Sequence, residues 1–227
     1  MNVVITGAGR GLGLGFVNHY LAQQANVWAC CRSESVQLSQ IQDPCLHKVE
    51  WDVTEPKDAS AIRKMGLPDR IDLLINNAGI YGPAKSDGQS LEGVDINAMQ
   101  STFNVNCIGP LNVVKALMSR LIAAKGKIAN VSSKMGSSDD NTSGGCYAYR
   151  ASKAALVMVS KSMAIDLEPE GVRVITLHPG WVRTDMTNQS GLIDVQTSVD
   201  GMTQVIDRIE KYSPGTFVAF DGKVIPY

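Results

Sequence analysis

Residues 3–13 read VVITGAGRGLG, a short apolar run followed at once by a turn with four glycines. Val and Ile favour a strand, and the pattern that begins at Gly11 favours a helix, so the glycines fall between two elements. A glycine backbone lets a pyrophosphate approach closely, and the N–H groups and dipole of the following helix favour its negative charge. This order of strand, glycine turn and helix predicts a dinucleotide site.

The same alternation of short apolar runs and helical patterns continues along the chain. We expect strands at residues 3–6, 27–31, 48–51, 71–75, 127–132, 172–177 and 216–219. We expect helices at residues 11–24, 94–124, 147–167 and 195–211, the second bent at Gly109-Pro110. Parallel strands need crossovers that pack back on the sheet. The order therefore predicts a doubly wound (Rossmann-type) α/β fold, with a parallel sheet flanked by helices in a single domain, residues 1–227.

Composition narrows the class of protein. The 227 residues are 44% hydrophobic and 19% charged, which is typical of a globular chain. Lys and Arg number 21 against 22 Asp and Glu, so we expect neither a nucleic-acid nor a membrane partner. The apolar runs are shorter than a spanning helix needs, and no secretory pattern opens the chain, so we expect a cytoplasmic protein. Five cysteines without a CxxC pair and three scattered histidines predict no disulfide framework and no metal site.

The end of the second expected strand bears on the choice of cofactor. An NAD site of this kind places Asp or Glu there, about 20 residues after the glycine turn, to bind the ribose 2′-OH. Here the residues are Cys30-Cys31-Arg32-Ser33. Arg32, and Arg10 inside the glycine turn, would match the oxygens of a 2′-phosphate. We therefore expect NADP(H) to be preferred over NAD(H).

Tyr149 and Lys153 stand four residues apart on an expected helix, so their side chains share one face. A phenol is a poor acid or base at neutral pH, but a neighbouring ammonium group and a cationic nicotinamide both favour the phenolate. Tyr149 would then give a proton to a carbonyl oxygen as hydride arrives. Tyr147 lacks such a partner, because Ala151 follows it at the same interval.

Five motifs occur in order and at sensible separations. They are TGAGRGLG at 6–13, NNAG at 76–79, NVSS at 130–133, YRASK at 149–153 and PG at 179–180. Together they make essentially the whole chain similar to the short-chain dehydrogenase/reductase family. Loop sequences, among them residues 141–145 and GTF at 215–217, resemble the C-factor and sniffer-like carbonyl reductases of that family.

The resemblance implies roles for further residues. Ser133 would hydrogen-bond the substrate carbonyl, because Ser133-xx-Gly136 fits the family pattern, although the interval to Tyr149 is longer than usual and Ser132 and Ser137 are alternatives. Asn106 would hold a water for a proton relay through Lys153. Asp52 and Val53 would contact adenine. The segment after the sixth strand would bind the nicotinamide carboxamide. The cofactor-binding set is Gly7, Arg10, Gly11, Leu12, Gly13, Arg32, Asp52, Val53, Asn77, Ala78, Gly79, Tyr149, Lys153, Pro179, Gly180, Val182 and Thr184.

The function expected from these residues is NADPH-dependent reduction of an aldehyde, ketone or quinone. The alternative is a C-factor type of signalling protein, in which cofactor occupancy rather than turnover is read by a partner. The apolar residues on more than one side of the helices at 94–124 and 147–167 predict a homodimer or homotetramer. The polar, glycine-bearing loops at 81–93 and 137–146 are expected to border the substrate pocket.

Overall fold

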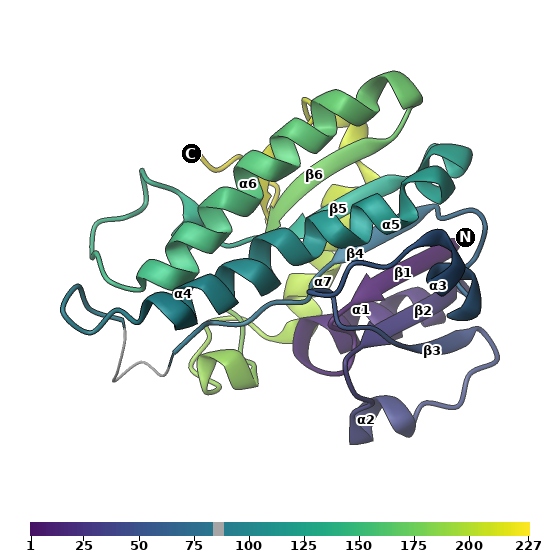
Figure 1. Ribbon diagram of the computed structural model, residues 1–227, viewed down its shortest axis with the longest axis horizontal. Helices are drawn as coiled ribbons and strands as arrows, with labels where there is room; N and C mark the ends of the chain where they lie inside the picture. The colour runs from purple at the N-terminus through teal and green to yellow at the C-terminus, as the bar shows by residue number, and fades with distance from the viewer. Residues whose placement is uncertain (84–88) are drawn as a thin grey trace.

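The computed structural model describes residues 1–83 and 89–227, which form one parallel sheet covered by helices on both faces (Figure 1). The strands are β1 (Asn2–Thr6), β2 (Asn26–Cys31), β3 (Leu46–Glu50), β4 (Leu73–Asn76), β5 (Lys127–Val131), β6 (Arg173–His178) and β7 (Phe217–Ala219). Their order in the sheet is β3-β2-β1-β4-β5-β6-β7, and every neighbouring pair is parallel. The predicted doubly wound α/β fold is confirmed.

Seven helices connect the strands within the described part of the chain. They are α1 (Gly11–Ala22), α2 (Val36–Ser39), α3 (Ala59–Lys64), α4 (Ile96–Phe103), α5 (Gly109–Ala124), α6 (Tyr147–Leu167) and α7 (Val195–Asp207). Figure 1 views the molecule from the face that α4, α5 and α6 cover. Because β1 lies between β2 and β4, the chain reverses its direction of winding there, and a crevice opens at the carboxyl ends of these strands.

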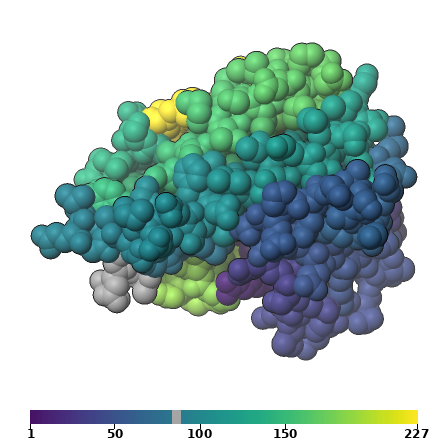
Figure 2. Space-filling view, in the orientation of Figure 1, coloured from purple at the N-terminus to yellow at the C-terminus, as the bar shows by residue number. Residues whose placement is uncertain are grey.

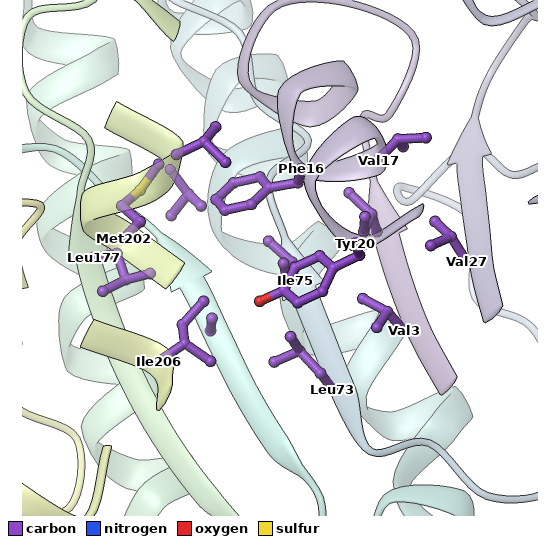
Figure 3. Close-up of a cluster of buried hydrophobic side chains, with 14 of the residues drawn as sticks. Val3, Phe16, Val17, Tyr20, Val27, Leu73, Ile75, Leu177, Met202 and Ile206 are labelled. Atoms are coloured by element: carbon purple, nitrogen blue, oxygen red, sulfur yellow. The ribbon is translucent and has the colours of Figure 1, made fainter. Parts of the chain in front are cut away.

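The sheet has a separate hydrophobic core on each face, because successive side chains of a strand point to opposite sides. Val3 and Ile5 of β1 belong to the cluster under α1 and α7, whereas Val4 belongs to the cluster under α3, α5 and α6. Figure 3 shows the first cluster, where Phe16 and Tyr20 of α1 lie against the strands and against α7. The apolar runs read from the sequence are therefore buried on both faces, as parallel strands require.

The long helix expected at 94–124 is one continuous helical run over Ile96–Ala124 that contains a π-helical turn. Helix α4 ends at Phe103, a π-helical turn covers Asn104–Ile108, and α5 begins at Gly109, where Pro110 occupies the first turn. Because Ile108 and Gly109 are helical as well, Pro110 removes one N–H donor from a continuous helix, directly after the π turn. The π turn faces the edge of the sheet that carries the crevice, and it contacts α6.

The stretch Ile96–Ala124 is long and apolar enough to cross a membrane by length and composition, since an 18-residue window of it has a mean hydropathy of 1.3. This differs from the expectation that no segment of the chain would meet that test. In the fold, Val113, Leu117 and Leu121 of this stretch are buried against the sheet. Of the apolar window, 39% is buried in the domain, so burial accounts for part of its apolar composition.

Phe16→Ala tests the packing of the first core. Phe16 is fully buried, so the substitution removes a large side chain from a close-packed cluster and should lower the free energy of unfolding by about 3–5 kcal/mol. Asn18→Ala on the exposed side of the same helix is the control and should change it by less than about 0.5 kcal/mol. Urea denaturation of both variants measures the difference, and equal effects would contradict the assigned packing.

Candidate active site at the carboxyl edge of the sheet

A pocket of about 390 Å³ opens at the carboxyl ends of β1, β2 and β4. Eleven of the residues predicted to bind a cofactor line it, namely Gly7, Arg10, Gly11, Leu12, Arg32, Asp52, Val53, Asn77, Ala78, Gly79 and Thr184. The structure thus brings together segments that lie far apart in the sequence. Ser35, Trp51 and Met186 also line the pocket and were not predicted from the sequence.

The glycine turn is held against β4 by close packing and hydrogen bonds. A Cβ on Gly13 would lie 2.1 Å from the carbonyl oxygen of Gly7, so a side chain at position 13 would displace the turn. The Asn77 amide donates to the carbonyl oxygens of Thr6 and Gly7, at 3.1 Å each. Gly13 therefore allows α1 to pack closely against the turn. Gly7 and Gly11, both with positive φ, line the pocket.

The turn leaves the first N–H groups of α1 open toward the pocket. Arg10 precedes the helix, its side chain makes no capping hydrogen bond, and among the described residues no acidic side chain occupies the first turn. Such N–H groups and the helix dipole favour an anion. The turn and the helix start therefore fit the pyrophosphate of a dinucleotide.

The pocket carries two arginines, Arg10 and Arg32, and each has a carboxylate nearby. Arg32 lies near Asp52, whose pKa is held below its usual range, first by hydrogen bonds from Thr54 and to a smaller extent by the charge of Arg32. Glu34 pairs with Lys48 at 2.9 Å. Arg10 pairs with Asp185 at 3.5 Å, and both side chains are exposed, so solvent screens this contact. Arginine side chains match the geometry of phosphate oxygens.

The segment after β6 lies beside the glycine turn. Figure 2 shows this light green segment next to the purple start of the chain. Pro179 accepts a hydrogen bond from the Ser198 hydroxyl at 2.6 Å, and Val182 pairs with Ile193 in an isolated parallel bridge. Gly180 has a φ of +86°, and a Cβ there would lie 2.8 Å from the Ile193 side chain. These contacts fix a loop at the border of the pocket.

Tyr149 and Lys153 lie on the first turns of α6, and both are buried. The Lys153 ammonium group donates to the carbonyl oxygen of Val131 at 2.9 Å and lies 5.8 Å from the centre of the Tyr149 ring. Burial raises the pKa of Tyr149 to about 12, opposed by a hydrogen bond from Ser133. Burial lowers the pKa of Lys153 to about 8. Burial therefore raises the pKa of Tyr149 more than the neighbouring groups of the protein lower it. Without a cofactor, Tyr149 is a neutral phenol that can donate a proton.

The three candidate serines have different surroundings. Ser132 donates to the carbonyl oxygen of Lys153 at 3.0 Å, and the Ser137 hydroxyl accepts from the backbone of Asp140 at 3.3 Å. Ser133 lies within reach of the Tyr149 hydroxyl, and its own hydroxyl also accepts from the backbone N–H of Met135. A Cβ on Gly136 would lie 2.7 Å from the backbone of Lys153, so this glycine allows the turn of Ser133 to pack on α6. Of the three hydroxyls, Ser133 is the one placed beside Tyr149.

Asn106 lies within the π turn and joins three elements. Its amide donates to the carbonyl oxygen of Ile80 at 2.8 Å and to the Ser152 hydroxyl at 3.0 Å, and its side-chain oxygen accepts from the N–H of Ile80 at 2.8 Å. The amide therefore positions the loop after β4 against α6. The water relay expected at Asn106 stays a prediction, since none of these contacts tests it.

Two further groups near Tyr149 come from the loops that were expected to border the substrate. The rings of Tyr81 and Tyr149 lie 4.9 Å apart, and the Tyr81 hydroxyl is 3.0 Å from the Cys146 thiol. Part of the first loop, residues 84–88, lies outside the described residues. Neither Tyr81 nor Cys146 belongs to a motif that the sequence alone singles out.

Comparison with known proteins places these features in context. The sequence profile of a family described as short chain dehydrogenase matches residues 1–192. The C-signal protein of Myxococcus xanthus is 44% identical over 158 residues, which is 69% of this chain and 93% of that protein. The NADPH-bound carbonyl reductase from chicken fatty liver superposes with a TM-score of 0.87 at 32% identity, covering 100% of this chain and 98% of that one. The carbonyl reductase Sniffer of D. melanogaster gives 0.88 at 31% identity, covering 100% and 99%.

The imidazole of His178, at the end of β6, should make the protein less stable in mild acid. Its Nδ1 accepts from the Lys134 N–H at 3.2 Å, and its pKa is lowered to about 4, first by burial and then by the charge of Lys134. The His178 imidazole is therefore protonated near pH 6.5 in the unfolded chain but only near pH 4 in the folded protein. This contribution to stability is full above pH 6.5 and is lost as the pH falls, by about 3 kcal/mol over the window.

Urea unfolding between pH 7 and pH 4 measures this loss. His178→Asn is the matched variant, because it keeps an acceptor for the Lys134 N–H and does not titrate. Its stability should fall less steeply with pH than that of the natural protein, and identical slopes would rule out His178 as the source.

Proposed function

This chain belongs to the short-chain dehydrogenase family, and from that premise we propose that it reduces the carbonyl group of an aldehyde, ketone or quinone with NADPH. The observation that carries the proposal is the placement of Tyr149, Ser133 and Lys153 at the carboxyl end of β5, next to a pocket that fits a dinucleotide. Two of the similar solved proteins carry the name carbonyl reductase.

The described residues support distinct roles in this reaction. The bound dinucleotide supplies the hydride. Tyr149, neutral by itself, donates a proton to the substrate oxygen, and Ser133 donates a hydrogen bond to that oxygen. Lys153, with a pKa of about 8, can return a proton to Tyr149 near neutral pH, and Asn106 would hold the water that supplies it. Enclosure of these groups keeps water from competing with the transfer.

The cofactor set extends beyond the pocket lining. The N–H groups of residues 11–13 would hold the pyrophosphate, Asp52 and Val53 would contact adenine, and residues 179–184 would hold the nicotinamide end. NADPH rather than NADH is proposed because of Arg10 and Arg32.

The compartment and assembly of the protein are also proposals. All five cysteines are free, which fits a reducing compartment such as the cytoplasm. Helices α4, α5 and α6 expose large apolar side chains, among them Ile96, Met118 and Ile165. A second copy that covers them would explain their exposure, so we propose a homodimer or homotetramer.

The C-signal relative favours a second function, in which a partner protein reads cofactor occupancy. A pull-down from lysate with and without NADPH distinguishes the two. A partner retained only with NADPH, and retained equally by Tyr149→Phe, would support signalling without turnover.

Tyr149→Phe tests the role of the proton donor. The variant keeps the ring and loses the hydroxyl, so kcat for NADPH-dependent reduction should fall by about 10²–10⁴-fold while NADPH binding is unchanged. NADPH consumption is followed with a panel of aldehydes, ketones and quinones. Tyr147→Phe, two residues away on the same helix, is the control and should keep its activity. Full activity of Tyr149→Phe would exclude the proposed chemistry.

Arg32→Ala tests the choice of cofactor. Loss of a charge-assisted contact with the 2′-phosphate should lower kcat/KM for NADPH by about 10-fold or more and leave that for NADH unchanged. Arg63→Ala, on the surface helix α3, serves as a control for loss of a positive charge. An equal loss of kcat/KM with NADPH and with NADH would show that Arg32 does not bind the 2′-phosphate.

A further inference from the structure

Tyr81 and Cys146 connect the two loops that flank the catalytic helix. The Tyr81 ring packs on the Tyr149 ring at 4.9 Å between centroids and 35° between planes. Its hydroxyl and the Cys146 thiol are hydrogen-bonded at 3.0 Å. The Tyr81 side chain therefore contacts both Tyr149, the proposed proton donor, and Cys146, the residue that precedes α6.

Cys146 is well placed to fix the start of α6. It precedes the helix with a positive φ of 51°, and its carbonyl oxygen accepts from the N–H of Arg150 at 2.9 Å. Its own N–H donates to the carbonyl oxygen of Gln89 at 2.8 Å, and the Gln89 amide donates to Pro83 at 2.8 Å. The loop after β4 and the loop before α6 are thus bonded to each other on both sides of the thiol.

The proposed reaction depends on the orientation of the Tyr149 phenol. Ser133 approaches its hydroxyl, and Lys153 is turned toward Val131. The side of the ring is contacted by Tyr81, which is only partly exposed, while Tyr149 itself is 8% exposed. Two aromatic rings in contact favour particular relative orientations, in addition to the stabilisation from the apolar area that they bury.

We propose that Tyr81 is a positioning residue for the reaction: its ring holds the Tyr149 phenol in the orientation for proton donation, and the Cys146 thiol holds Tyr81. The inference rests on the proposed function for its kinetic consequence. Among residues 1–83 and 89–227, the groups found beside the pair include Ser133, Lys153, Cys146 and Arg150. Burial raises the pKa of Tyr81, so it stays a neutral phenol beside Tyr149.

The first test compares Tyr81→Leu with Tyr81→Phe. The leucine variant loses the ring contact, so kcat should fall by about 10–100-fold with KM for NADPH unchanged. Phenylalanine keeps the ring and loses only the hydrogen bond to the Cys146 thiol, so its kcat should fall by about fivefold, as in Cys146→Ala. Tyr147→Leu, a partly exposed tyrosine on the same helix, is the matched control and should keep its kcat. An unchanged kcat in Tyr81→Leu, a change in substrate KM alone, or an equal loss in Tyr147→Leu would overturn the proposal.

The second test removes only the thiol. Cys146→Ala loses the hydrogen bond to Tyr81 and should lower kcat by about fivefold, and Cys146→Ser, which restores a hydroxyl at the site, should recover most of it. These variants leave the aromatic pair in place, so they decide the matter should Tyr81→Leu fail to fold. Equal activity of all three proteins would show that the thiol has no part in holding Tyr81.

The third readout does not depend on turnover. Tyrosine labelled with ¹³C at Cζ reports ionisation of each phenol by NMR, and Tyr149→Phe identifies the Tyr149 signal. Because burial keeps the pKa of Tyr149 near 12, removal of the covering ring in Tyr81→Leu should lower it. An unchanged pKa would overturn the positioning role. Failure of the natural protein to reduce any carbonyl, with the pKa shift present, would instead reject the proposed function alone.

Discussion

The ammonium group of Lys153 lies inside the protein, 2.9 Å from the carbonyl oxygen of Val131, and this contact sets how α6 sits on the sheet. A buried charge is costly unless it is hydrogen-bonded, so the helix cannot slide along β5 without losing its partner. The Ser132 hydroxyl donates to the backbone carbonyl oxygen of Lys153. Gly136 packs directly on the Lys153 backbone, where a side chain would not fit. The relative positions of Tyr149 and Ser133 follow from this attachment.

The cofactor pocket depends on an equally tight contact on the neighbouring strands. Gly13 packs against the Gly7 carbonyl, and Asn77 ties the turn to the end of β4. The same β4 end continues to Ile80, which Asn106 connects to α6. The site that would hold the dinucleotide and the site that would transfer a proton are therefore joined through the short segment after β4 and the hydrogen bonds of the Asn77 and Asn106 side chains. Such rigid attachment preserves the orientation that the chemistry requires.

The sheet, its parallel order and the glycine turn could be predicted because apolar runs and glycine spacing are local signals. Helices α2 and α3 were missed because four and six residues are too short to show a helical period, although Ser35 and Asp58 cap them. The π turn at Asn104–Ile108 leaves no recognisable pattern. Tyr81 and Cys146 meet across 65 residues of sequence, and only the fold reveals their contact with each other and with Tyr149.

The most direct measurement of the central claim is the fate of the transferred hydrogen. The protein is incubated with NADPH deuterated at one or the other C4 position and with a carbonyl compound that it reduces, and mass spectrometry of the alcohol follows. The account predicts deuterium on the carbinol carbon from one of the two labelled forms only, because a rigid pocket presents a single face of the ring to the substrate. Consumption of NADPH without deuterium in the alcohol, or equal transfer from both forms, would contradict it.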